Sequence, residues 1–318
     1  MATQPRHHQL LILSQHFETY QSLISHEKLP GLSLLAFRDP DQAIRAGADC
    51  DLLFGEPALV SQILNQLPNL AWVQTTWAGV DALLAAGMRK DYMLTNTRDV
   101  YGEMISQYVF GYLLMIERRI LARWQAQQER RWDDSGHGNL KGKLIGLLGV
   151  GTIGSHLAAT AHHFGMQVHG YTRQSETCPD VDEYFHGAEL SRFAADLDYL
   201  ACTLPGTTAT RGLVNANFLA ALPKKAWLVN TGRGSTVNET DLVEALRRGS
   251  LAGAVLDVFA EEPLPPDHPL WSTPNTFITF HSAARNYPPD IAALFVENYR
   301  LFIQGKPLLH QVDFELGY

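Results

Sequence analysis

Residues 144–154 decide the fold, and they read Leu144-Ile145-Gly146-Leu147-Leu148-Gly149-Val150-Gly151-Thr152-Ile153-Gly154. The apolar run 144–148 predicts a buried strand, and it leads directly into glycines with the spacing GxGxxG. A helical pattern follows over 152–164, Gly165 ends it, and a second apolar run begins at Gln167. This order of strand, glycine turn, helix and strand is the setting in which GxGxxG indicates a dinucleotide-binding unit of the Rossmann type.

The glycines have separate physical roles in such a unit. Gly149 permits the tight turn, Gly151 lets a diphosphate approach the backbone, and Gly154 lets the helix and the strand pack closely. The N–H groups of the first helical turn, at Thr152 and Ile153, and the positive end of the helix dipole then bind the diphosphate. We therefore assign these five residues to a cofactor site.

The residues just after the second strand bear on the choice of cofactor. An Asp or Glu at this place binds the ribose 2′-hydroxyl of NAD, whereas an Arg suits the 2′-phosphate of NADP. The chain has Arg173 here, and the first acidic residue is Glu176, which we expect beyond the strand tip. The sequence predicts that Arg173 binds the cofactor and that NADP is preferred to NAD. The alternative is a solvated Arg173 beside a pocket that accepts both.

Outward from this unit, short apolar runs alternate with helical patterns along nearly the whole chain, which predicts parallel α/β architecture. The first set of candidate strands predicts a compact α/β unit of flavodoxin-like strand order, and the second set predicts a doubly wound Rossmann-type sheet. The first set is Leu10–Leu13, Leu34–Phe37, Leu52–Phe54, Trp72–Thr75 and Met93–Thr95. The second set is Leu144–Leu148, Gln167–Tyr171, Tyr199–Thr203, Trp227–Asn230, Ala254–Asp257 and Phe277–Thr279.

Between the two sets, Tyr101–Trp124 predicts one long helix that is apolar on more than one face. A helix of this kind must be buried on several sides. It is either the central helix of a monomer or a helix that also meets a second subunit, and we expect a homodimer.

Composition excludes several classes of protein. The 318 residues suffice for about two domains, and 46% hydrophobic with 18% charged residues is typical of a globular chain. A net charge of −8 argues against nucleic-acid binding. The polar N-terminus, Met1–Gln9, lacks a signal core, and the uncharged stretch Leu144–Thr172 holds too many glycines and histidines for a membrane span. Three cysteines without metal-ligand or redox spacing predict neither a metal site nor a disulfide framework, and favour a cytoplasmic location.

Three further motifs follow later strands of the second set. They lie at the edge of the sheet where open α/β proteins bind ligands. The motifs are Val229-Asn230-Thr231-Gly232-Arg233-Gly234, Leu256-Asp257-Val258-Phe259-Ala260-Glu261-Glu262-Pro263-Leu264-Pro265 and Ile278-Thr279-Phe280-His281-Ser282-Ala283-Ala284.

With these motifs, and with Thr76-Trp77-Ala78-Gly79-Val80-Asp81 earlier in the chain, the sequence resembles the D-isomer-specific 2-hydroxyacid dehydrogenase family over nearly its whole length. The segments Arg98-Asp99, 104–108 and 127–132 resemble the glyoxylate/hydroxypyruvate reductase branch of that family. The resemblance implies that the Rossmann-type domain, residues 99–286, is inserted into a smaller flavodoxin-like substrate domain, residues 1–98 plus 287–318.

The resemblance also implies roles for individual residues. Arg233 would bind the substrate, His281 would donate the proton, and Glu262 would raise the pKa of His281. The expected reaction is the reduction of a small 2-keto acid to the D-2-hydroxy acid. The expected contacts of the cofactor, besides the glycine turn and Arg173, are Leu204, Pro205, Thr231, Gly232 and Asp257, and those of the substrate are Trp77, Ala78, Gly79 and Arg233.

Two departures from the family pattern concern the wall of the pocket. Phe280 precedes the histidine where the family commonly has Pro, and Ala283-Ala284 replaces glycines. Two alternatives stay open. A formate dehydrogenase-like enzyme needs no proton donor and has Gln where this chain has Glu262, and a dinucleotide-sensing corepressor would have no turnover at all.

Overall fold

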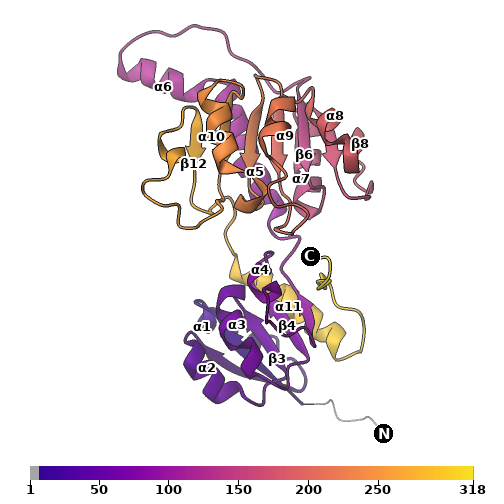
Figure 1. Ribbon diagram of the computed structural model, residues 1–318. Coiled ribbons are helices and arrows are strands. Elements are labelled where there is room, and N and C mark those ends of the chain that lie inside the picture. Colours follow the sequence, from indigo (N-terminus) through magenta and orange to yellow (C-terminus); the bar gives the residue numbers. More distant parts are fainter. Residues whose placement is uncertain (1–6, 318) are drawn as a thin grey trace. The chain divides into compact units, whose positions relative to one another are not determined.

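The computed structural model describes residues 7–317, so residues 1–6 of the polar N-terminus lie outside the described part (Figure 1). Contacts between Cα atoms divide the chain into two compact units. Unit 1 is Met1–Val100 with Asn286–Tyr318, and unit 2 is Tyr101–Arg285. The boundaries fall at 100/101 and 285/286, beside the 98/99 and 286/287 expected from the sequence.

Unit 1 is built on a five-stranded parallel sheet with the order β2-β1-β3-β4-β5. This is the flavodoxin-like order that we predicted. Its strands are β1 (His8–Leu13), β2 (Leu32–Phe37), β3 (Leu52–Gly55), β4 (Trp72–Thr75) and β5 (Met93–Thr95). Its helices are α1 (Phe17–His26), α2 (Pro40–Gly47), α3 (Pro57–Ile63), η1 (Leu64–Gln66), α4 (Asp81–Leu84) and α11 (Pro288–Phe302).

Alternate side chains of β1 pack into two separate hydrophobic layers. Leu10 and Ile12 pack in the layer that contains residues of α1 and α11, and Leu11 and Leu13 pack in the layer that contains residues of α2, α3 and α4. In the first layer the ring of Phe295, from α11, stacks on Trp72 with centroids 5.1 Å apart. The last helix of the chain is therefore part of the core of unit 1.

Unit 2 is built on a seven-stranded parallel sheet with the order β12-β11-β10-β9-β6-β7-β8, the Rossmann arrangement with one added edge strand. Its strands are β6 (Leu144–Leu148), β7 (Gln167–Tyr171), β8 (Glu183–Phe185), β9 (Tyr199–Cys202), β10 (Trp227–Asn230), β11 (Gly253–Leu256) and β12 (Thr276–Ile278). Its helices are α5 (Gly102–Glu117), α6 (Ile120–Gln128), α7 (Thr152–His163), η2 (Gly187–Glu189), α8 (Leu190–Ala194), α9 (Ala216–Ala221), η3 (Gly234–Thr236), α10 (Glu239–Arg247) and η4 (Pro269–Ser272).

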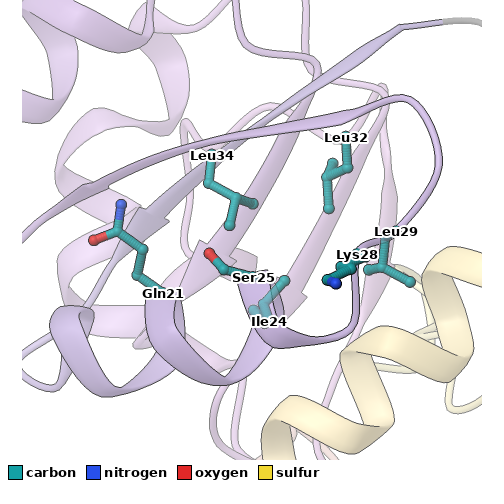
Figure 2. Close-up of a pocket in the computed structure, with 7 residues that line it drawn as sticks. All are labelled: Gln21, Ile24, Ser25, Lys28, Leu29, Leu32 and Leu34. Atoms are coloured by element: carbon teal, nitrogen blue, oxygen red, sulfur yellow. The ribbon is translucent and has the colours of Figure 1, made fainter.

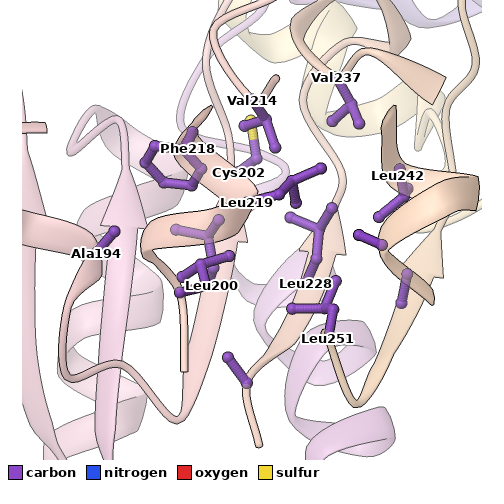
Figure 3. Close-up of a cluster of buried hydrophobic side chains, with 14 of the residues drawn as sticks. Ala194, Leu200, Cys202, Val214, Phe218, Leu219, Leu228, Val237, Leu242 and Leu251 are labelled. Atoms are coloured by element: carbon purple, nitrogen blue, oxygen red, sulfur yellow. The ribbon is translucent and has the colours of Figure 1, made fainter. Parts of the chain in front are cut away.

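The core of unit 2 beside β9 and β10 is apolar and closely packed. Figure 3 shows Leu200 of β9 and Leu228 of β10 meeting side chains of α9 and α10, such as Leu219 and Leu242. Asn238 caps α10 by accepting a hydrogen bond from the Asp241 N–H, as the spacing of these two residues in the sequence indicates. This packing holds β9 and β10 against the helices that follow them, α9 and α10.

The prediction of one long helix over Tyr101–Trp124 is wrong. The structure has two helices, because the carbonyl of Glu117 accepts the backbone N–H of Gly138 at 3.0 Å, in place of a helical partner. Arg119 takes the left-handed conformation, with φ of 54°, and bonds Ser135. The second helix, α6, therefore leaves the line of α5, and its apolar residues Ile120, Leu121 and Trp124 are exposed.

Among residues 7–317, no helix combines the length and the apolar character that crossing a bilayer requires. Cys50, Cys178 and Cys202 are free and buried.

Candidate active site

The predicted site residues of unit 2 follow strands that end at one edge of the sheet. Because β6, β9, β10, β11 and β12 are parallel and paired in register, the loops after them all leave from this edge. Strand order reverses between β6 and β9, and ligands of open α/β sheets bind at such a point.

The glycine turn has the geometry that a dinucleotide needs. Gly149 has a φ of 97°, which favours glycine, and a Cβ on Gly154 would lie 2.3 Å from the Gly149 carbonyl oxygen. A Cβ on Gly151 would meet nothing within 4 Å, so the backbone there borders open space. Helix α7 begins at Thr152, and N–H groups of a first helical turn lack intrahelical acceptors. These residues fit a diphosphate.

The loops after β9 and β10 touch each other beside this turn. A Cβ on Gly232 would lie 2.8 Å from the carbonyl oxygen of Leu204, and one on Gly149 would lie 3.1 Å from the Leu204 side chain. The N–H of Thr231 bonds the Cys202 carbonyl, and the Pro205 carbonyl accepts the Thr210 hydroxyl at 2.6 Å. The structure thus brings Leu204 and Gly232 to the glycine turn.

Arg173 lies two residues beyond β7 and is exposed. The carboxylate of Glu176, the first acidic residue after the strand, is hydrogen-bonded to Nε2 of His186 at 2.8 Å. This bond, together with the Thr172 carbonyl, raises the pKa of His186 above its ordinary value. The first acidic side chain after Arg173 in the sequence is therefore already hydrogen-bonded to a histidine.

Glu262 and His281 form a hydrogen-bonded pair. Nδ1 of His281 lies 2.8 Å from Oε2 of Glu262, and Oε1 of Glu262 accepts the Phe259 N–H at 2.9 Å. The bond to Glu262 raises the pKa of His281 above its ordinary value. Burial pulls the pKa of Glu262 upward, but the hydrogen bonds from His281 and Phe259 outweigh it and hold that pKa below its usual range.

Arg233 follows β10 and lies close enough to act on this pair. Its positive charge lowers the pKa values of both Glu262 and His281. Its Nη1 donates to the Gly232 carbonyl at 2.7 Å, and the Asn230 side chain bonds the Arg233 carbonyl at 3.1 Å. The three residues singled out as catalytic in the sequence therefore gather at the edge that carries the glycine turn.

The carboxylate of Asp257 is hydrogen-bonded to the segment that carries His281. It accepts the Thr279 hydroxyl and the N–H groups of Ser282 and Ala283, at 2.8 and 3.0 Å. Sequence reasoning assigned no role to Thr279, although a polar residue at the end of an apolar strand, two positions before the histidine, was a visible signal.

In unit 1, the residues expected to contact substrate follow β4. The Trp77 carbonyl accepts the Thr97 N–H at 3.1 Å and the Thr75 hydroxyl at 2.8 Å, and the Ala78 carbonyl accepts the Asn96 side chain at 2.7 Å. The side chain of Trp77 is 45% exposed. Asn96 and Thr97, just after β5, thus bond the carbonyls of Trp77 and Ala78.

A cavity of about 330 Å³ elsewhere in unit 1 shares no residue with these motifs. Figure 2 shows it between α1 and β2. It is lined by Gln21, Ile24, Ser25, Lys28, Leu29, Leu32 and Leu34. In the part of the chain that the structure describes, no three His, Cys, Asp or Glu residues are grouped so as to hold a metal ion.

Comparison with known proteins agrees with this geometry. Residues 110–283 match the family described as "D-isomer specific 2-hydroxyacid dehydrogenase, NAD binding domain". A glyoxylate/hydroxypyruvate reductase A of Klebsiella pneumoniae subsp. pneumoniae is 31% identical over 256 residues, which cover 76% of this chain and 80% of the relative.

Two solved structures are similar over 98% of this chain and 100% of theirs. A D-isomer specific 2-hydroxyacid dehydrogenase family protein of Aeromonas salmonicida subsp. salmonicida is 40% identical, with a TM-score of 0.91. An NADPH-dependent glyoxylate/hydroxypyruvate reductase of Sinorhizobium meliloti, in complex with NADP and sulfate, is 28% identical, with a TM-score of 0.86. The chain therefore belongs to the D-isomer-specific 2-hydroxyacid dehydrogenase family, as an oxidoreductase whose second unit carries the NAD-binding domain.

Proposed function

We propose that the protein reduces a small 2-keto acid of the glyoxylate/hydroxypyruvate type to the D-2-hydroxy acid, with NADPH as reductant. The observation that carries the proposal is the bonded pair Glu262–His281 beside Arg233, at the sheet edge that holds the dinucleotide turn. The names of the Klebsiella and Sinorhizobium relatives support the substrate class.

Each residue of the site has its own role in the proposed reaction. Bound NADPH supplies a hydride to the carbonyl carbon of the substrate. Arg233 binds the carboxylate with charge-assisted hydrogen bonds and polarises the neighbouring ketone. Because Nδ1 of His281 faces Glu262, Nε2 delivers the proton to the oxygen, which completes the hydroxyl group. In unit 1, we assign further substrate contacts to Trp77, Ala78 and Gly79.

A panel of substrates tests this proposal against its alternatives. Initial rates with glyoxylate, hydroxypyruvate and pyruvate, each with NADPH and with NADH, should show saturable reduction of the 2-keto acids. Oxidation of formate with NADP or NAD, and no keto-acid reduction, would identify a formate dehydrogenase-like enzyme. Cofactor binding without any turnover would favour the corepressor-like alternative.

Glu262 should set the pH dependence of the reaction. His281 must be protonated to act as donor, and its bond to Glu262 raises its pKa, so activity should persist above the ordinary pKa of an imidazole. In the Glu262→Gln variant the negative charge beside His281 is lost, so the pKa of His281 should fall. The alkaline limb of the plot of kcat/KM against pH should therefore move to lower pH. An unchanged alkaline limb would show that Glu262 does not act on the donor.

Arg173 should set the preference for NADPH. We assign it to the 2′-phosphate, because it follows β7 and because Glu176 is engaged by His186. Arg173→Ala should raise the KM for NADPH by about 10–100-fold, the effect of losing a hydrogen bond to a charged group. It should leave the KM for NADH within about twofold, because NADH has no 2′-phosphate for Arg173 to bind. Arg192→Ala, which removes an exposed arginine paired with Glu183, is the control. A wild-type protein that prefers NADH would refute the assignment.

We also propose that two copies of the chain form a dimer through α6. Its residues Ile120, Leu121 and Trp124 are 47–60% exposed, and Trp132, just beyond it, is 90% exposed. Clusters of large exposed apolar side chains mark interaction sites, and a second copy presenting the same face would bury both clusters at once. Light scattering should give twice the chain mass for the wild type and for Leu316→Glu, and the mass of one chain for Trp124→Glu. A monomeric wild type at micromolar concentration would exclude the dimer.

A further inference from the structure

We propose that Tyr108 and Thr279 are positioning residues for His281, and that they act through the carboxylate of Asp257. The proposal rests on the proposed role of His281 as proton donor, and extends it to a helix to which no catalytic role was assigned. The Tyr108 hydroxyl, on α5, lies 2.7 Å from the Thr279 hydroxyl, 171 residues further along the chain.

The first step concerns the backbone of His281. Its φ of 52° lies in the left-handed region, which a residue with a side chain adopts only where surrounding contacts fix it. The His281 N–H donates to the Asp257 carbonyl at 2.8 Å. The next two N–H groups, of Ser282 and Ala283, donate to the Asp257 carboxylate. Asp257, which is only 2% exposed, thus fixes the backbone at and after the histidine.

The second step concerns what holds Asp257 itself. Thr279 has one hydroxyl proton, and it donates that proton to Oδ1 of Asp257. The same hydroxyl must therefore act as acceptor toward Tyr108, so the order of donation is Tyr108 to Thr279 to Asp257. Burial raises the pKa of Tyr108 well above its ordinary value, so the phenol keeps its proton under working conditions. We call this chain of three side chains the hydroxyl relay.

The third step concerns the anchor of the relay. The ring of Tyr108 packs on that of Tyr112, with centroids 5.0 Å apart, and Tyr112 packs on Phe277 of β12 at 5.7 Å. On α5, Phe110 stacks on Phe164 at 5.3 Å, just after α7. The relay therefore ties the segment that carries His281 to a packed helix. Because small misplacements of reacting groups cost large factors in rate, loss of the relay should lower kcat.

Four variants test the relay. Tyr108→Phe should lower kcat, because it removes the hydroxyl that bonds Thr279. Thr279→Val keeps the branched shape and removes the hydroxyl, and should lower kcat about tenfold with the KM for NADPH within about twofold. Thr279→Ser, which restores the hydroxyl, should recover kcat to within about threefold of the wild type. The double variant Tyr108→Phe/Thr279→Val should be no slower than Thr279→Val alone, because the relay is already broken.

The matched control is Tyr199→Phe. This tyrosine is also buried in unit 2, and its hydroxyl bonds a carboxylate, that of Glu117, but it lies at the start of β9, away from the functional edge. Its kcat should stay at the wild-type value even if its melting temperature falls.

The relay is overturned if Thr279→Val and Tyr108→Phe, folded by circular dichroism, both keep wild-type kcat. It is equally overturned if Thr279→Ser fails to recover kcat, or if the effects of the two substitutions add in full. Failure of the proposed function has a different signature, since the wild type itself would then show no reduction of 2-keto acids, whatever the relay variants do.

Discussion

Replacing His281 by alanine should lower kcat for 2-keto acid reduction by roughly 10²–10⁴-fold, the usual contribution of a general acid. The hydride would still be available, but the forming alkoxide would have to take its proton from water. The KM for NADPH should change little, because the imidazole is assigned to the substrate and not to the cofactor. Steady-state rates at saturating NADPH and hydroxypyruvate measure the effect.

The matched control for this substitution is His163→Ala. His163 lies at the end of α7, is exposed, and contacts the ring of Phe164. Its removal should leave kcat unchanged. Turnover of the His281→Ala variant within about threefold of the wild type would be incompatible with a contribution of the size expected for a general acid.

The second large effect is expected at Arg233. Arg233→Ala should lower kcat/KM by roughly 10²–10³-fold, as loss of a preorganised charge at a developing oxyanion does. Arg233→Lys should recover only part of this, because an ammonium group lacks the planar fork that binds a carboxylate and its neighbouring carbonyl together.

Arg248→Ala is the control, since this exposed arginine caps the C-terminus of α10 and forms a salt bridge with Glu244 of the same helix. If Arg233→Ala raised KM modestly and left kcat intact, Arg233 would be a binding residue without a role in polarising the ketone.

Much of the fold could be predicted because its strands are short apolar runs with clear ends. The predicted and observed bounds coincide for β4, β5, β6, β7 and β10. Strand β8 was missed because its three residues, Glu183–Phe185, begin with a charged residue and follow Asp182, so they form no apolar run. The break between α5 and α6 was missed because it depends on residues that follow later in the sequence. Gly138 bonds the carbonyl of Glu117, and Ser135 bonds the side chain of Arg119.

The candidate site divides in the same way. Residues that belong to a short sequence motif, such as Gly151, Arg233 and His281, could be assigned from their sequence neighbours alone. The contact between Tyr108 and Thr279 could not be predicted, because nothing in the sequence shows that this residue of α5 meets the residue just after β12. Only the folded chain brings the two hydroxyl groups together.

The measurement that bears most directly on the proposed reaction is the initial rate of NADPH oxidation by the purified protein with hydroxypyruvate, followed by chiral analysis of the product. We predict saturable turnover at about 1–10³ per second, typical of enzymes, with D-glycerate as the product. No consumption of NADPH with hydroxypyruvate or glyoxylate, or formation of L-glycerate, would contradict the proposed function.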